Sequence, residues 1–200
     1  MKKNYKQFFT LLAFCTVAFN PILHSQTIYK INESKDIDMK LSGTSTLHKW
    51  NMDTKTFSGE AKFVFNPANE NKLTSITSLN FSLAVKDLKS GDRGLDKNAG
   101  KALKSDTYKD ILYKLTSAKV VPVANNKYLL KTQGSLTIAG ITKQVAMDVN
   151  CTVNEDASIN CSGSYKLEMT DYKVKPPTFM LGAMKTGDAI TLDYTLVYKK

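Results

Sequence analysis

The chain is poor in the residues on which most protein chemistry depends. Its 200 residues include one tryptophan, two histidines and three cysteines, and Arg93 is its only arginine. Proteins that read nucleic acids use arginine forks to bind phosphate and guanine, and the lysines of this chain are scattered without a basic run. Nucleic acid is therefore not an expected partner. The net charge of +10 favours transient contact with anionic lipid head groups, with a solvated surface as the simpler alternative.

The sequence also lacks an apolar run long enough to cross a bilayer. The short run Phe8–Phe19 follows three lysines and precedes the helix breaker Asn20-Pro21, an order typical of a secretory signal peptide. We expect residues 1–25 to be removed after Ser25, which leaves residues 26–200 as one domain with a net charge of +7. The mature protein is then periplasmic or secreted. An uncleaved membrane anchor is the alternative.

Catalytic and metal-binding patterns are scarce. Beyond the predicted signal peptide, His48 is the only histidine, which excludes metal sites that need two histidine ligands. The spacing between Cys151 and Cys161 lacks the close pairing typical of zinc sites. Asp171 and Asp188 lie in different connections, and nothing marks them as an acid–base pair. We therefore predict that the protein is not an enzyme and holds no metal or cofactor.

A period of two dominates the rest of the chain. Within residues 76–86, Leu79, Phe81, Leu83 and Val85 alternate with polar residues, which places the apolar side chains on one face of a strand. Similar segments recur up to the C-terminus, and turn residues separate them. The pattern predicts an all-β fold, an antiparallel barrel of about eight strands. A short helix is expected at 96–104, in a central connection.

The cysteines occupy matching positions in one predicted hairpin. Cys151 lies on the apolar face of 145–153 and Cys161 on that of 159–167, with turn residues at 154–157 between them. A hairpin centred near residue 156 places the two side chains opposite each other and facing inward. We predict a disulfide between them, with two buried thiols as the alternative.

Several motifs, taken in order, resemble a known family. They cover nearly all of the predicted mature chain and comprise Ser42–Trp50, Phe57-Ser58-Gly59 with Phe63, Asp87–Gly91, Tyr108–Tyr113, Gly134–Lys143, Lys175-Pro176-Pro177 and Gly187-Asp188. Together they resemble the YceI-like domain, in the exported form common in Bacteroidota. Tyr108-Lys109 departs from the Tyr-Pro that the family often has, and the cysteine hairpin is not general to the family.

The resemblance implies a lipocalin-like barrel that binds a long apolar lipid, such as a polyisoprenoid or an isoprenoid quinone, in its lumen. The expected lining consists of large inward-facing residues, for each of which plain core packing is the alternative: Trp50, Met52, Phe63, Phe65, Phe81, Leu83, Val85, Tyr113, Met147, Tyr165 and Phe179. His48, Arg93 and Tyr108 are candidates to bind a lipid head group at the mouth. The identity of the lipid, transport against storage, and a homodimer are left open. A stress-linked enzyme or accessory factor built on the same barrel is the second functional hypothesis.

Overall fold

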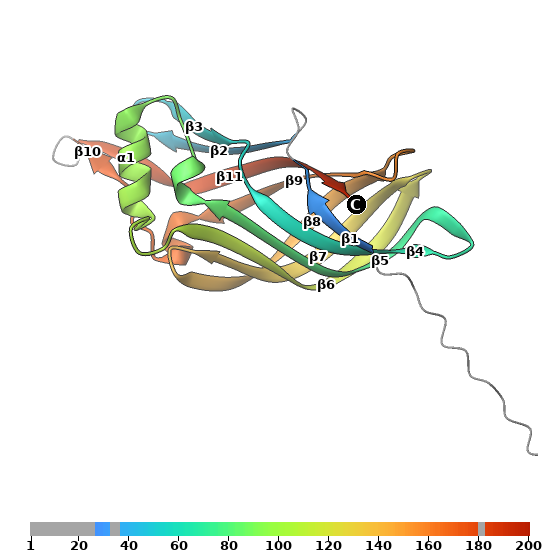
Figure 1. The fold of residues 1–200 in the computed structure, drawn as a ribbon. Helices are drawn as coiled ribbons and strands as arrows, with labels where there is room; N and C mark the ends of the chain where they lie inside the picture. The colour runs from blue at the N-terminus through green and yellow to red at the C-terminus, as the bar shows by residue number, and fades with distance from the viewer. Residues whose placement is uncertain (1–26, 33–36, 180–182) are drawn as a thin grey trace, which may run out of the picture.

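The computed structural model describes residues 27–32, 37–179 and 183–200. These residues form a long antiparallel sheet that curls into a barrel (Figure 1). The strands are β1 (Thr27–Ile31), β2 (Asp38–Ser45), β3 (Lys49–Thr54), β4 (Ser58–Asn66), β5 (Asn69–Ala84), β6 (Asp110–Ala124), β7 (Lys127–Ile138), β8 (Ile141–Val153), β9 (Ile159–Glu168), β10 (Thr178–Phe179) and β11 (Met184–Lys199). The helices are the 3₁₀ turns η1 (Val85–Asp87) and η2 (Met169–Tyr172) and one α-helix, α1 (Arg93–Ala102). The predicted signal peptide, residues 1–25, lies outside the described residues.

Eight strands form a closed ring. Their order is β1-β4-β5-β6-β7-β8-β9-β11, and β11 closes the ring by pairing with β1. From β4 to β9 each strand pairs with the next one along the chain, as hairpin-linked alternating segments predict. The predicted all-β antiparallel barrel of about eight strands, with one short helix in a central connection, is confirmed.

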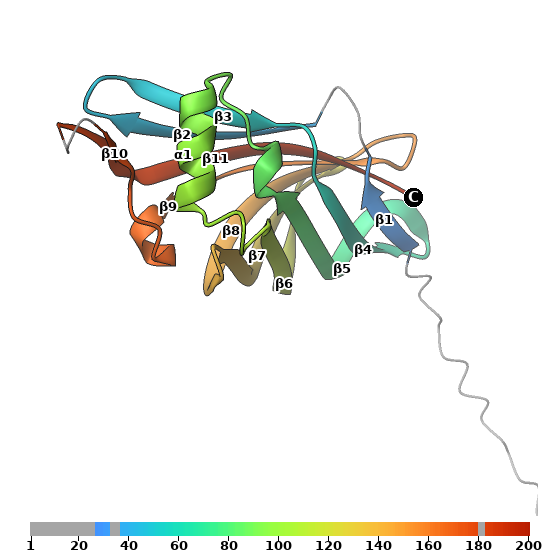
Figure 2. The ribbon, with the colours of Figure 1, turned by 60° about the vertical axis from the view of Figure 1, so that its left-hand side comes forward.

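Strand β11 changes partner along one of its edges, and this makes the two ends of the barrel different. Its last residues pair with β1, whereas Thr186 to Thr195 pair with β2, which continues to β3. We call the part where β1 completes the ring the closed end. We call the opposite part, formed by the β2–β3 hairpin and α1, the mouth end (Figure 2). There β3 is linked to the segment before α1 by a backbone bridge, in which Asp53 N–H donates to Lys89 O at 2.7 Å and Lys89 N–H donates to Asp53 O at 2.9 Å.

Helix α1 begins three residues earlier than its apolar spacing predicts. The Asp92 carboxylate accepts hydrogen bonds from Gly94 N–H at 2.6 Å and Leu95 N–H at 3.0 Å. Such an N-cap satisfies backbone donors that the first turn leaves unpaired. The helix ends at Ala102, and Lys104 then takes a left-handed conformation with φ of 53°. The Asp92 cap explains why the helix starts before the expected residue 96.

The most deeply buried side chains lie at the closed end. Tyr29, Phe63 and Tyr198 come from β1, β4 and β11, and each is 1% exposed. Phe63 packs edge-on against both tyrosines, with ring centroids 5.3 Å from Tyr29 and 5.6 Å from Tyr198. These aromatic rings fill the space where β1 completes the ring.

Strand β5 ends two residues before the end of the predicted segment 76–86. It stops at Ala84, and Val85 begins the 3₁₀ turn η1, where its N–H donates to Lys109 O at 2.8 Å. Val85 is buried in the hydrophobic core, but because it lies in this turn it does not line the lumen. The backbone leaves the ladder here because the chain must turn toward α1, a requirement that lies outside the local alternation.

The predicted register of the cysteine hairpin is confirmed, but the bridge is not. Cys151 of β8 lies opposite Cys161 of β9, and both are buried. Both are free thiols in this structure, so the predicted disulfide is not present. A hydrogen bond with the Cys161 thiol, together with burial, raises the pKa of Cys151 well above its usual value.

Candidate ligand-binding lumen

The interior of the barrel is open and strongly apolar. A cavity of about 120 Å³, which we call the inner chamber, is roughly ten times the space that one water molecule needs. Its walls come from nearly every strand of the ring, and no charged side chain is among the described residues that line it. The predicted residues that line it are Phe63, Phe81, Leu83, Tyr113 and Met147. Such a cavity binds water poorly and apolar chains well.

A second cavity, of about 90 Å³, continues the lumen toward the mouth end. In this outer chamber the predicted residues Trp50 and Met52 face Leu95, Ala99 and other apolar residues of α1. The two chambers share four lining residues, Leu41, Ile111, Ile138 and Leu167. They are therefore adjacent parts of one lumen, and α1 covers the outer part.

The outer chamber leads to a polar opening. An open pocket of about 500 Å³, the mouth pocket, is lined by His48, Asp92, Asn98 and Lys185 among others. It shares Trp50, Leu95 and Thr186 with the outer chamber. The indole N–H of Trp50 donates to Thr44 O at 3.1 Å, which holds the ring at the boundary between the polar and apolar parts. The lumen thus changes from hydrophilic to hydrophobic with depth.

The polar atoms of the inner chamber are hydroxyl groups. Tyr113 Oη donates to Thr132 Oγ1 at 3.4 Å, and Thr132 Oγ1 donates to Met147 O at 2.8 Å. Burial raises the pKa of Tyr113, although the bond to Thr132 partly offsets this. These groups stay neutral at physiological pH and accommodate neutral ligands.

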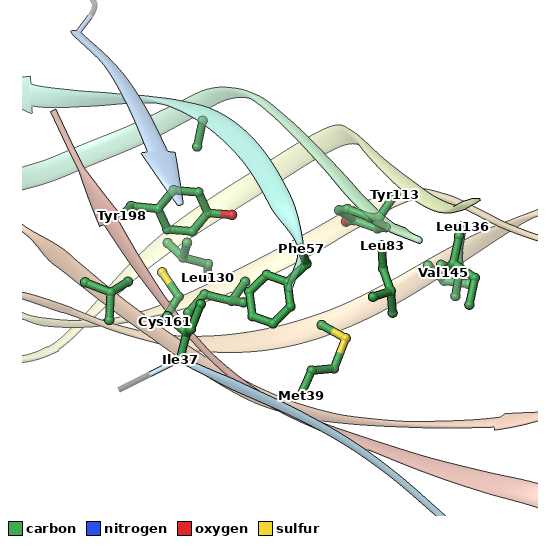
Figure 3. Packing of buried hydrophobic residues seen from close by; sticks show 14 of the residues in the cluster. Ile37, Met39, Phe57, Leu83, Tyr113, Leu130, Leu136, Val145, Cys161 and Tyr198 are labelled. Carbon is green, nitrogen blue, oxygen red and sulfur yellow. The ribbon is translucent and has the colours of Figure 1, made fainter. Parts of the chain in front are cut away.

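Tyr198 has a different environment. Within the described part of the chain its Oη is buried and has no hydrogen-bond partner. Figure 3 shows its ring among core residues, with the hydroxyl directed into the barrel interior. Burial raises the pKa of Tyr198 well above its usual value, and the neighbouring Cys161 thiol adds to this effect. A buried unpaired hydroxyl costs about 1–3 kcal/mol, so it is a ready donor for an acceptor atom inside the lumen.

Two glycines make room for aromatic rings inside the lumen. A Cβ at Gly134 would lie 2.5 Å from Tyr113 Cζ, and one at Gly163 would lie 2.7 Å from Tyr194 Cζ. Both rings line the inner chamber. Gly134 also lies opposite a register shift in β6, between Leu115 and Ser117. The sequence pattern did not indicate that Gly134 leaves the space occupied by the Tyr113 ring.

Three other residues predicted to line the lumen belong to the surrounding core. The side chain of a fourth lies outside the described part of the structure. Val85 is buried, and Phe65 and Tyr165 are partly buried against the core, but none of the three borders either chamber. Phe65 packs against Tyr29, with 6.2 Å between ring centroids. Phe179 lies in β10, and its side chain is outside the described part of the structure.

The head-group candidates lie apart from one another. His48 lines the mouth pocket. Arg93 is exposed at the first turn of α1, next to Gly94 of that pocket, without lining it. Tyr108 follows the helix, and its ring lies over Gly140, where an added Cβ would be 2.5 Å from Tyr108 Cζ. The structure therefore places only His48 in the opening.

Several lining residues were not predicted. Leu136, Ile138, Tyr194 and Tyr198 have the inward parity of their strands, so alternation could have identified them. The α1 residues Leu95, Ala99, Ala102 and Leu103 have helical spacing, but which surface they cover depends on the tertiary structure. No cluster of three or more histidine, cysteine, aspartate or glutamate side chains suited to a metal ion occurs within 27–32, 37–179 and 183–200. Over the same ranges, no helix is both long and apolar enough to span a membrane.

Comparisons with known proteins give the same fold. A family model described as the YceI-like domain matches residues 29–198. The crystal structure of Burkholderia cenocepacia BcnA is similar, with a TM-score of 0.64 and 22% identity over 84% of this chain and 98% of that one. A polyisoprenoid binding domain from Saccharophagus degradans, implicated in plant cell wall breakdown, has a TM-score of 0.63 and 12% identity over 86% of this chain and 97% of its own.

A third solved structure covers still more of the chain. The Campylobacter jejuni YCEI protein has a TM-score of 0.54 and 20% identity, and the match covers 98% of this chain and 99% of that one. A search of curated proteins gives no match. At these identities the solved structures establish the fold alone.

Proposed function

The chain belongs to the YceI-like domain family, and on this premise we propose that it binds or carries a long apolar lipid in its lumen. The candidate ligands are a polyisoprenoid and an isoprenoid quinone. The observation that carries the proposal is the pair of adjoining chambers, which open through a polar pocket and are lined by uncharged side chains. The polyisoprenoid binding domain from Saccharophagus degradans, which has a similar fold, supports the choice of ligand.

The energetics of such binding need no charged site. A long lipid chain buries hundreds of Å² of apolar surface, which contributes roughly 25 cal/mol per Å² before ordering costs. Flexible residues such as Met39 and Met147 line the inner chamber, and methionine adapts its shape to irregular ligands. Burial keeps the tyrosine hydroxyls of the lumen neutral, which suits the binding of a neutral lipid.

Export is part of the proposal. A lysine-rich start, a short apolar run and a helix breaker support removal of residues 1–25 and a periplasmic or secreted location. N-terminal sequencing of the protein recovered from the cell envelope or medium tests this. An intact Met1 in the membrane fraction would contradict it.

The binding proposal is tested by filling the lumen. Leu83 is 2% exposed and lines the inner chamber, so Leu83→Trp should occupy the space of the lipid. Leu112 on the adjacent strand is exposed, and its position pairs with Ser82. Leu112→Trp is therefore a matched control that adds the same ring outside the barrel.

The measurement is the lipid that co-purifies with each protein, identified by mass spectrometry, together with thermal unfolding. We expect lipid with wild type and with Leu112→Trp, and at least about tenfold less with a folded Leu83→Trp, because the indole ring fills the space of the lipid. If the interior is ordinary core, Leu83→Trp should instead lower stability by about 1–3 kcal/mol, with no lipid to lose. A wild-type protein that emerges free of lipid, and takes up neither isoprenoid quinone nor polyprenyl phosphate, would remove the support for a carrier.

A further inference from the structure

Helix α1 has two chemically distinct faces. Its apolar residues Leu95, Ala99 and Ala102 line the outer chamber. Arg93, Lys97 and Lys101 follow one another at intervals of four residues, which places them on one side of the helix. All three are exposed. The helix that covers the lumen therefore presents a row of positive charge to solvent, which we call the basic stripe.

The basic stripe forms no ion pair with the acids near it. Within the described residues the ion pairs join Lys30 to Glu60 and Lys143 to Asp171, and neither involves α1. The acidic side chain within the helix, Asp96, points to the segment before the helix: its Oδ1 accepts hydrogen bonds from Ser90 N–H at 2.8 Å and Ser90 Oγ at 2.7 Å. Asp92 and Asp96 reduce the net charge of residues 92–102 to +1, but the three basic side chains are exposed and have no ion-pair partner in the described part of the chain, so they can bind an external anion.

An exposed leucine lines the mouth pocket next to α1. Leu47, at the tip of the β2–β3 hairpin, is 67% exposed. The tip is held in shape by Ser45 Oγ, which accepts from Leu47 N–H and His48 N–H at 3.3 Å each. Leu47 and His48 line the mouth pocket together with Gly94 and Leu95 of α1. Figure 2 shows the β2–β3 hairpin and α1 at the same end of the barrel.

We propose that the basic stripe and Leu47 together form a docking surface for an anionic lipid bilayer. Basic side chains attract the negative surface, and an exposed apolar residue enters the interface. Docking in this way would place the mouth pocket against the membrane. The bilayer would then contact α1, the helix that covers the lumen. A role of docking in lipid exchange rests on the proposed carrier function. Binding of α1 and Leu47 to a bilayer does not depend on that function.

Helix α1 is suited to this role because it is weakly held. None of its residues is fully buried. Gly94 and Gly100 lie within it, and glycine in a helix interior lowers helix stability relative to alanine. The element proposed to meet the bilayer therefore has little burial to hold it over the lumen.

The test is binding to vesicles of phosphatidylcholine with and without phosphatidylglycerol, using processed protein purified from cells that produce the full chain. The test variant is Lys97→Gln with Lys101→Gln. The matched control is Lys114→Gln with Lys131→Gln, which removes the same charge from exposed positions on the barrel wall. Leu47→Ser tests the apolar contact. All five positions are exposed, so thermal unfolding should match wild type.

We expect wild type to bind vesicles that contain phosphatidylglycerol and to be released by high salt. Each lysine near an anionic surface contributes about a fivefold gain in affinity, so the α1 pair should weaken binding at least about tenfold. The barrel-wall pair should weaken it by less than about threefold, and Leu47→Ser should weaken it several-fold. Equal losses for the two lysine pairs, absence of binding by wild type, or equal binding to neutral vesicles would overturn the proposal.

The lipid that co-purifies with each variant separates this proposal from the carrier function. Variants that keep their lumen lipid but lose vesicle binding would support the docking surface as a site in its own right. A wild-type protein that carries no lipid but binds anionic vesicles through α1 would support docking and contradict the carrier function.

Discussion

The two ends of this barrel are built on opposite principles. At the closed end, β1 pairs with both β4 and β11, and Phe63 packs between Tyr29 and Tyr198. At the mouth end, α1 covers the outer chamber without a single fully buried residue. Burial of large side chains stabilises the closed end. The mouth end has fewer deeply buried side chains on its covering helix, a feature of elements with low local stability.

Removing one large side chain from each end should give the widest contrast. Phe63→Ala leaves a cavity in the closed end and should lower the free energy of unfolding by about 3–5 kcal/mol. Leu95→Ala on the half-buried face of α1 should lower it by about 1 kcal/mol. Urea denaturation of both variants measures the difference. Equal losses would show that α1 is as well anchored as the aromatic core.

Two glycines should respond to the same substitution with opposite signs. At Gly134 an added Cβ would lie 2.5 Å from Tyr113 Cζ and 2.6 Å from Lys114 O, so Gly134→Ala should destabilise the barrel by about 1–3 kcal/mol. In α1 the Cβ at Gly100 would lie 3.2 Å from Ser105 Oγ, a hydroxyl that can rotate away.

Gly100→Ala should therefore strengthen the helix by up to about 1 kcal/mol. Denaturation measures the change at Gly134, and hydrogen exchange of the α1 amides measures the change at Gly100. Greater exchange in Gly100→Ala would mean that Ser105 cannot adjust and that the helix is packed more tightly than its exposure indicates.

Substitution of Tyr198 should affect the stability of the barrel and its affinity for a ligand in opposite directions. Without lipid, Tyr198→Phe removes a buried unpaired hydroxyl and should raise the free energy of unfolding by about 1 kcal/mol. The control is Tyr128→Phe, because Tyr128 Oη accepts a hydrogen bond from Leu73 N–H at 3.1 Å and its loss should destabilise. Denaturation of the delipidated proteins checks both signs.

The same variant should bind a lipid with an acceptor oxygen several-fold more weakly than wild type. Titration with an isoprenoid quinone and with a polyisoprenoid hydrocarbon measures this effect. A loss of affinity for the quinone alone would place its oxygen near Tyr198. Unchanged affinity for both ligands would show that the hydroxyl takes no part in binding.

Acid should loosen helix α1 at the mouth end. Hydrogen bonds from the Ser90 hydroxyl, and then from its N–H, hold the pKa of Asp96 below its usual range. Since the folded-state pKa is below the unfolded one, this stabilisation is present above the unfolded pKa and is lost as the pH falls through the lowered value. We expect α1 exchange to rise as the pH falls below the ordinary carboxyl value of 3.8, and Asp96→Asn to show little such change. Exchange of α1 that stays constant at low pH, or that rises equally in Asp96→Asn, would contradict this assignment.

Local patterns were sufficient for much of the fold. Alternation over 76–86 predicted the inward set of Leu79, Phe81 and Leu83, all of which line the inner chamber. Turn residues at 154–157 predicted the register that brings Cys151 opposite Cys161. Both predictions depend on neighbours within one strand or one hairpin, where the period of two and the turn length set side-chain direction.

Alternation alone did not show which inward-facing residues border a cavity. Tyr165 has the inward parity of its strand yet packs against the core outside both chambers, because parity gives the face of a residue and not the space in front of it. The alternation also extended two residues too far, through Val85 and Lys86, which belong to the turn that follows β5.

By itself, the sequence determined the class of fold, the order of strands around most of the ring and an uncharged interior, since each follows from residues close together along the chain. Only the tertiary structure decided that β11 divides its edge between β1 and β2, that α1 covers the outer chamber, and that Tyr198 is buried without a partner. These features depend on pairings between distant segments and on the volume left between them, which no local pattern encodes.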